Sequence, residues 1–270
     1  MCTFYLDRWH LVPDGDSIVT NTSHLLPVIR QGHPAMLKLT VHEDERLGAG
    51  LMAWWDGAGA ALVLAQEGDA LLMTRAMETG SLASWAWDGR DDEACRILCA
   101  NAARLHAPRA TPLLPLMRLA ERFAALAPMA TAYGGIMRRC DAAARSLLAS
   151  PRDIVPLHGD LRHENVLDFG SDGWLAIDPK GVLGERGFDF SNIFCNPHDE
   201  EGTICSDPDR FRHRLAVVTE AANLERERQL LWILAWCGLS TAWCLKDDPE
   251  PPFEQLELAE IAAAELDRLA

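Results

Sequence analysis

The pattern of apolar residues changes once along the chain, and this change constrains the fold more than any other feature. The first part has short apolar runs separated by turn signals, with one helical pattern at Asp44–Trp55. From Gly80 onward amphipathic helices dominate, beginning with Asp91–His106, whose first turn is acidic. We therefore predict an α+β protein with a small strand-rich N-terminal lobe, residues 1–78, and a larger helical C-terminal lobe, residues 79–270.

The turn signals predict the individual elements. Asp14-Gly15 should close a hairpin between two strands, and Gln31 to Pro34 should separate the next pair. The expected strands are Trp9–Val12, Ser17–Thr20, Leu25–Arg30, Ala35–Thr40, Ala61–Ala65 and Ala70–Thr74. The further expected helices are Leu113–Ala127, Tyr133–Ala149, Pro208–Thr219, Leu224–Leu245 and Phe253–Leu269.

Charge and hydropathy exclude several classes of protein. A formal net charge of -15 argues against binding a nucleic-acid backbone, which needs basic surface, and favours a small cationic partner. No uncharged apolar run reaches the ~18 residues of a membrane span, and the N-terminus lacks a basic segment followed by an apolar one. We therefore expect no membrane segment. The cytoplasm is the expected location, and a monomer is the expected state.

Oxygen-bearing side chains gather between residues 158 and 178. Asp160 and Asn165 stand five residues apart on one expected loop, and Asp178 ends the following short strand. Phosphoryl transfer from ATP needs a carboxylate that orients the attacking hydroxyl, and oxygen ligands that hold Mg²⁺. The pattern suits that chemistry. An alternative is a metal hydrolase in which His158 and His163 bind a metal together with Asp160.

The segment HGDLRHEN followed by AIDP resembles the catalytic and metal-binding loops of the aminoglycoside phosphotransferases, which share a fold with protein kinases. Longer segments resemble the streptomycin 6-phosphotransferases, within the aminoglycoside/hydroxyurea resistance kinases. They include LPVIRQGHPAMLKL, WWDGAGA and GWLAIDPKGVLGERGFDFSNIF. The resemblance implies a bilobal protein-kinase-like fold. It also implies an ATP- and Mg²⁺-dependent enzyme that phosphorylates the 6-hydroxyl of streptomycin and confers resistance.

The resemblance also assigns roles in the C-terminal lobe. Asp160 resembles the catalytic base, and Asn165 and Asp178 resemble the two magnesium ligands. Arg162 stands where protein kinases have a catalytic-loop lysine, and could donate to the γ-phosphate. Asp189 resembles an aspartate that braces the catalytic loop from below.

The nucleotide-binding residues are expected in the first lobe. Lys38 resembles the lysine that holds the α- and β-phosphates, and Glu45 is the best candidate for its ion-pair partner. The segment from Met73 through Arg75 to Ala76 resembles the hinge whose backbone reads adenine. One departure concerns the phosphate loop, because the glycine-free segment 21–24 stands where a glycine-rich loop belongs.

A streptomycin pocket would need carboxylates for the two guanidinium groups of that antibiotic. We expect these carboxylates beside Asp160, and the candidates are Asp199, Glu200, Glu201, Asp247 and Asp248. Two further hypotheses stay open. The chain could be a kinase of the same fold with another alcohol or amino sugar as acceptor, or a catalytically inactive kinase fold that serves as a binding module.

Overall fold

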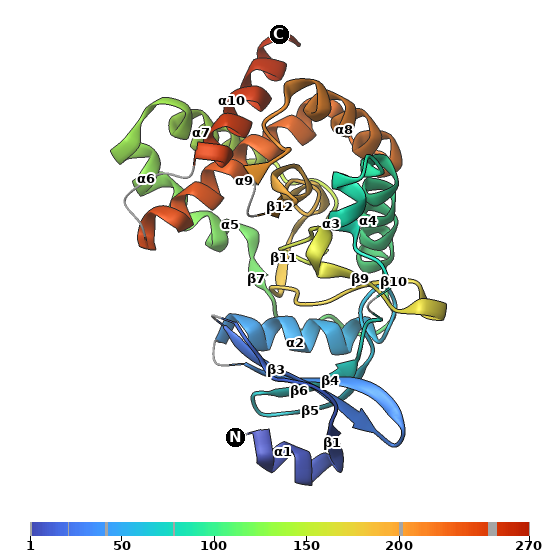
Figure 1. Ribbon diagram of the computed structural model, residues 1–270. Helices are drawn as coiled ribbons and strands as arrows, with labels where there is room; N and C mark the ends of the chain where they lie inside the picture. The colour runs from blue at the N-terminus through green and yellow to red at the C-terminus, as the bar shows by residue number, and fades with distance from the viewer. Residues whose placement is uncertain are drawn as a thin grey trace.

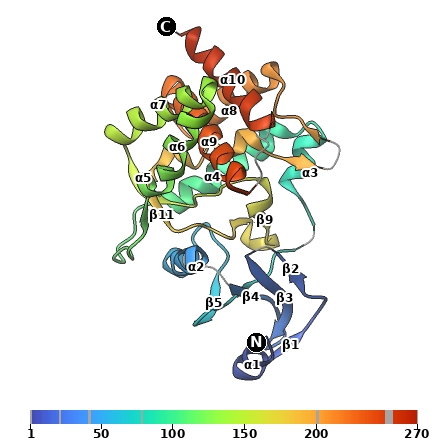
Figure 2. The same ribbon diagram turned by 90° about the vertical axis from the view of Figure 1, so that its left-hand side faces the viewer.

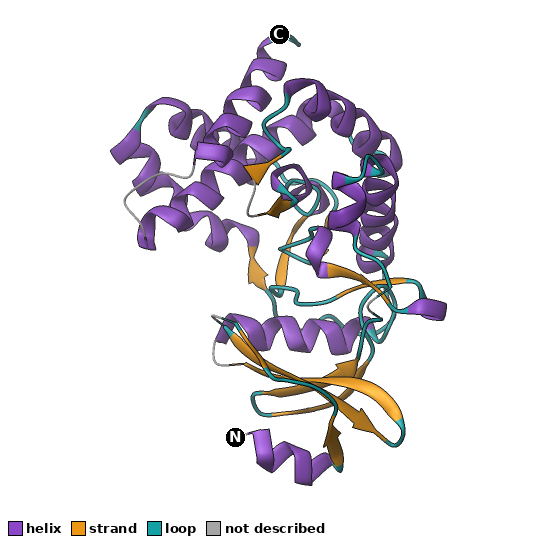
Figure 3. Ribbon diagram, viewed as in Figure 1, coloured by secondary structure: helices purple, strands orange, loops and turns teal. Residues whose placement is uncertain are grey.

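The computed structural model describes residues 2–20, 22–40, 43–77, 79–199, 202–247 and 253–269. A strand-rich N-terminal part lies below a helical C-terminal part, and the chain ends lie far apart (Figures 1 and 3). The predicted α+β class is confirmed. The exact boundary between residues 78 and 79 stays a prediction.

A six-stranded sheet dominates the N-terminal part, in the order β1-β3-β4-β6-β5 with β2 beside β3. Helix α2 covers the face toward the C-terminal part and α1 covers the other face (Figure 1). The elements are α1 Cys2–Trp9, β1 Leu11–Pro13, β2 Ile18–Val19, β3 Ser23–Arg30, β4 His33–Thr40, α2 Glu43–Trp55, β5 Val63–Glu67 and β6 Ala70–Thr74.

The expected hairpin at Asp14-Gly15 is wrong. The expected break between the next two strands is confirmed, but it is shorter, because β4 already begins at His33. Strands β1 and β2 both pair with the same edge of β3, one after the other, and not with each other. Trp9 ends a helix that the sequence analysis did not predict. Between β3 and β4, Gln31 and Gly32 have φ angles of 52° and 83°, as a two-residue turn between twisted strands requires.

The C-terminal part is built from helices around a small set of short strands (Figure 2). Its helices are α3 Leu82–Trp87, α4 Asp91–His106, α5 Leu119–Arg122, α6 Leu126–Tyr133, α7 Gly135–Ala149, α8 Pro208–Ala221, α9 Arg226–Asp247 and α10 Phe253–Asp267. Its strands are β7 Met117–Arg118, β8 Ile154–Leu157, β9 Val166–Asp168, β10 Trp174–Ala176, β11 Val182–Glu185, β12 His198–Asp199 and β13 Gly202–Thr203. In the described parts of the chain no helix is long and apolar enough to cross a membrane.

The predicted helix Leu113–Ala127 is wrong in its first half. Met117 and Arg118 form β7, which pairs in parallel with β11, and helix begins only at Leu119. Pro112 and Pro115 explain the difference, because proline removes a backbone donor and restricts the residue before it. The other predicted C-terminal helices are confirmed to within a few residues at each end.

Helix α2 lies in backbone contact with the segment that follows β10. A Cβ atom added at Gly48 would lie 1.8 Å from the carbonyl oxygen of Pro179. One added at Gly181 would lie 2.5 Å from Cβ of Leu47. These two glycines therefore allow the helix that carries Glu45 to approach the segment that carries Asp178.

Gly48→Ala should destabilise the protein, although alanine favours helix by up to about 1 kcal/mol. The added methyl meets a backbone carbonyl, so we expect a loss of about 1–3 kcal/mol, measured as a lower midpoint of thermal unfolding. Gly50→Ala on the same helix is the matched control, because its Cβ meets only the flexible tip of Leu114 at 2.9 Å. An unfolding midpoint for Gly48→Ala at or above that of Gly50→Ala would contradict the close approach.

Candidate active site

Asp189 supports the start of the loop between β8 and β9, which carries Asp160, as the resemblance implied. The two carboxylate oxygens of Asp189 accept the backbone N–H groups of His158 and Gly159, each over 2.8 Å. His106 contacts the same carboxylate through Nε2 at 2.8 Å. Asp189 is buried, so these bonds fix the start of the loop and stabilise the buried carboxylate.

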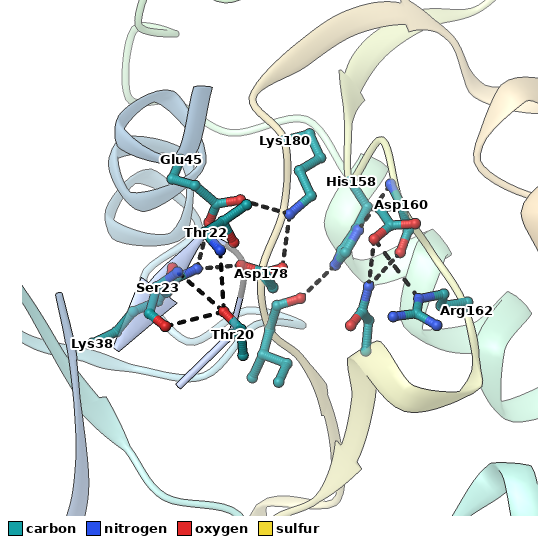
Figure 4. Close-up of polar contacts among 12 residues, drawn as sticks. Thr20, Thr22, Ser23, Lys38, Glu45, His158, Asp160, Arg162, Asp178 and Lys180 are labelled. Carbon is teal, nitrogen blue, oxygen red and sulfur yellow. Dashed lines mark hydrogen bonds and ion pairs between the residues drawn. The ribbon is translucent and has the colours of Figure 1, made fainter. Parts of the chain in front are cut away.

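Both side-chain oxygens of Asp160 accept hydrogen bonds, and Figure 4 shows Asp160 beside Arg162. Its Oδ1 accepts from Nδ2 of Asn192 at 2.7 Å, and its Oδ2 accepts from Nδ2 of Asn165 at 3.0 Å. Arg162 lies with Nε at 3.8 Å from Oδ2, and contacts Glu164 at 3.2 Å. The carboxylate thus accepts a hydrogen bond on each of its two oxygens.

Asn165 and Asp178 are brought together through one shared residue, Ile177. The backbone N–H of Ile177 donates to the carbonyl of Asn165 at 2.9 Å, and His158 bonds the carbonyl of Ile177 through Nε2 at 2.8 Å. The side-chain nitrogen of Asn165 is used by Asp160, which leaves its side-chain oxygen as the atom for a cation. Asp178 adopts a φ of 62°, an uncommon conformation for a residue with a side chain, beside this site.

Two lysines and two carboxylates form a closed ring between the N-terminal and C-terminal parts (Figure 4). Lys38 contacts Glu45 at 2.5 Å and also pairs with Asp178. Lys180 contacts Glu45 at 2.9 Å and Asp178 at 2.7 Å. The structure therefore pairs Lys38 with Glu45, as the sequence analysis expected, and adds Lys180, which it missed.

The charges of this ring set its protonation. Burial raises the pKa of the Asp178 carboxyl, but the charges of Lys38 and Lys180 outweigh burial and bring that pKa below its ordinary value. Burial lowers the pKa of Lys180, but the carboxylates of Asp178 and Glu45 outweigh burial and raise that pKa above its ordinary value. Asp178 is therefore ionised at neutral pH, and its carboxylate oxygens can bind a cation. Together with the Asn165 amide oxygen, it fits the hard oxygen ligands that Mg²⁺ prefers.

The histidine metal site does not form. His158 is buried, and its ring lies between the N–H of Asp160 and the carbonyl of Ile177. Burial, followed by the charge of Arg214, lowers the pKa of His163 to about 3, so this ring is neutral. Across the described ranges no group of three or more His, Cys, Asp or Glu side chains could hold a metal ion. The hydrolase alternative therefore has no support in the geometry.

The structure describes the expected hinge residues and residues 22–24 of the expected phosphate-loop segment, whereas Asn21 lies outside the described residues. Met73 lies inside β6 with strands on both sides, so Arg75 and Ala76 are the remaining candidates to contact adenine. The Arg75 side chain forms an ion pair with Asp14 at 2.5 Å. In place of a glycine loop, Thr20 accepts the backbone N–H of Ser23 at 3.0 Å, close to Lys38 (Figure 4).

The acidic residues expected around the acceptor fall outside what the structure describes. This holds for Glu200, Glu201 and Asp248, and for the side chains of Asp199 and Asp247. A described carboxylate beside Asp160 is Glu164, which sequence reasoning passed over. It is 36% exposed and linked to Asp160 through Arg162.

Comparisons with known proteins show the family to which the chain belongs. Residues 8–248 match the model of the aminoglycoside/hydroxyurea antibiotic resistance kinases. The chain is 51% identical to a streptomycin 3''-kinase of Klebsiella pneumoniae over 90% of this chain and 91% of that protein. It is 32% identical to a streptomycin 6-kinase of Streptomyces griseus over 90% of this chain and 81% of that protein.

Solved structures show the same fold at low sequence identity. A thermostable mutant of aminoglycoside phosphotransferase APH(4)-Ia, in a ternary complex with ADP and hygromycin B, matches with a TM-score of 0.64. It is 12% identical, and the match covers 97% of each chain. The protein-kinase-like fold implied by the sequence is thereby confirmed, and the chain belongs to the aminoglycoside/hydroxyurea antibiotic resistance kinase family.

Proposed function

We propose that this protein transfers the γ-phosphoryl group of ATP to a hydroxyl of streptomycin with the help of Mg²⁺, as a monomer in the cytoplasm. The observation that carries the proposal is the arrangement of Asp160 beside the pair Asn165 and Asp178. A base, two metal ligands and a phosphate-binding lysine within one site are the parts that phosphoryl transfer requires. All four side chains are intact, which argues against an inactive binding module.

Each site residue has a proposed role that follows from its position. Asp160 is 28% exposed, so its carboxylate can orient an incoming hydroxyl and accept its proton. Asn165 and Asp178 would hold Mg²⁺, which would supply positive charge to offset that of the phosphates. Lys38 would donate to the α- and β-phosphates, and Arg162 to the γ-phosphate. Arg75 and Ala76 would contact adenine through their backbone.

The relatives favour one acceptor hydroxyl over another. The 51% identity to a protein named streptomycin 3''-kinase exceeds the 32% identity to a streptomycin 6-kinase. We therefore favour the 3''-hydroxyl of streptomycin, and keep the 6-hydroxyl expected from the sequence as the alternative. A 30% identical relative is named hydroxyurea phosphotransferase, which makes hydroxyurea a second acceptor to test.

Asp160→Asn should lower kcat by a factor on the order of 10²–10⁴, because the proton acceptor is lost. The affinity for a nonhydrolysable ATP analogue should change by less than about threefold, since Asp160 faces the acceptor and not the nucleotide. Asp172→Asn, exposed on the turn between β9 and β10, is the control and should retain kcat. Retained turnover with lost nucleotide affinity would mean that Asp160 and Asp178 exchange roles.

Streptomycin should be phosphorylated with ATP, whereas kanamycin should be a poor acceptor because its ammonium groups are arranged differently. Binding of streptomycin should weaken as salt is raised, since partly exposed ion pairs are screened. The measurement is ADP release with streptomycin, kanamycin and hydroxyurea at two ionic strengths, followed by NMR of the product to locate the phosphate. Equal turnover of kanamycin, or no turnover of streptomycin, would remove the proposed substrate.

A further inference from the structure

A second asparagine holds Asp160 from outside the HGDLRHEN segment. Asn192 begins the short 3-10 helix Asn192–Cys195, and only 3% of its surface is exposed. Its Nδ2 donates to Oδ1 of Asp160 over 2.7 Å, whereas Asn165 donates to Oδ2. The two asparagines therefore hold opposite oxygens of the same carboxylate.

The orientation of the Asn192 amide is fixed by its other partner. Nδ2 of Asn196 donates to Oδ1 of Asn192 at 2.8 Å and to the Asn192 backbone oxygen at 2.9 Å. Because Oδ1 of Asn192 already accepts a hydrogen, the NH₂ side of this amide must face Asp160. The bonding pattern thus makes Asn192 a donor to the carboxylate and excludes the flipped amide.

A buried arginine anchors the asparagine pair in turn. Nη1 of Arg214 on α8 donates to the carbonyl oxygens of Asn196 at 2.7 Å and Ile193 at 2.6 Å. Its Nη2 contacts Asp91 of α4 at 2.7 Å. Burial raises the pKa of the Asp91 carboxyl, but Arg214 and Arg210 lower it to about 2. The Arg214–Asp91 pair therefore stays ionised at neutral pH and fixes the segment that carries Asn192.

We propose that Asn192 is a positioning residue for Asp160, held in its orientation by Asn196 and Arg214. The inference rests on the proposed function, in which Asp160 is the base. With a donor on each oxygen, rotation of the Asp160 carboxylate would break one of the two bonds. Loss of one donor lets the carboxylate turn, and a misplacement of about 1 Å at a reacting group can cost on the order of 10² in rate.

The isosteric variant Asn192→Asp tests the donor and keeps the shape, since it replaces the NH₂ group by an acceptor that faces Asp160. We expect kcat for streptomycin to fall about 100-fold, while the Kd of a nonhydrolysable ATP analogue stays within about threefold. The matched control is Asn101→Asp. Asn101 is equally buried and donates to the carbonyls of Gly59 and Trp174. The Asn101→Asp variant should have a lower unfolding midpoint, while its kcat stays within about twofold of the unaltered enzyme.

Equal kcat values in Asn192→Asp and Asn101→Asp would overturn the inference. A second measurement needs no substrate and uses smaller side chains. It compares the unfolding midpoints of Asp160→Ala, Asn192→Ala and the double variant, and the double shift should be smaller than the sum of the single shifts. Additive shifts would show that the contact between Asn192 and Asp160 contributes nothing to stability, which would contradict the inference. Absence of phosphoryl transfer by the unaltered enzyme would instead remove the proposed function, whatever the unfolding data show.

Discussion

The pairing of Asp178 with two lysines is the interaction on which the rest of the site depends. Asp178 belongs to the C-terminal part, whereas Lys38 and its partner Glu45 belong to the sheet and helix α2 of the N-terminal part. Lys180 contacts both carboxylates and closes the ring. Two positive and two negative charges balance, so the ring can be partly buried without a net charge, which would be costly to desolvate.

The ring forms only because helix α2 and the segment after β10 approach closely, and the loop that carries Asp160 is held by hydrogen bonds to Asp189. Gly48 and Gly181 allow helix α2 to lie against the segment 178–181, so Glu45 reaches both lysines. On the other side, Asp189 accepts two backbone N–H groups at the start of the loop. Asp178 and the loop that carries Asp160 are therefore positioned by separate contacts, one between the two parts of the molecule and one within the helical part.

Much of the fold and the site could be predicted from the sequence because local patterns and one dense motif carried the information. Helix Asp91–His106 has an acidic first turn and clear periodicity, and its bounds agree with the structure. Asp160, Asn165 and Asp178 lie within 19 consecutive residues, so their spacing and the resemblance to a known family identified them together.

What the sequence could not predict depends on contacts between distant segments. The pairing of both β1 and β2 with β3 is set by the sheet edge, and a local turn signal at Asp14-Gly15 does not encode it. Asn192 lies 32 positions from Asp160, and Lys180 lies 135 positions from Glu45, so no local spacing could link either pair. A lysine two residues after a predicted metal ligand was a signal that could have identified Lys180.

The most direct test of the account is the structure of the enzyme with a nonhydrolysable ATP analogue and Mg²⁺. The account predicts that the side-chain oxygens of Asn165 and Asp178 lie about 2.0–2.1 Å from the metal, with Lys38 at the phosphates. Asp160 should stay free of both the metal and the nucleotide, on the side from which the acceptor hydroxyl would approach. A metal held by His158 and His163, or bound without contact to Asp178, would contradict the account.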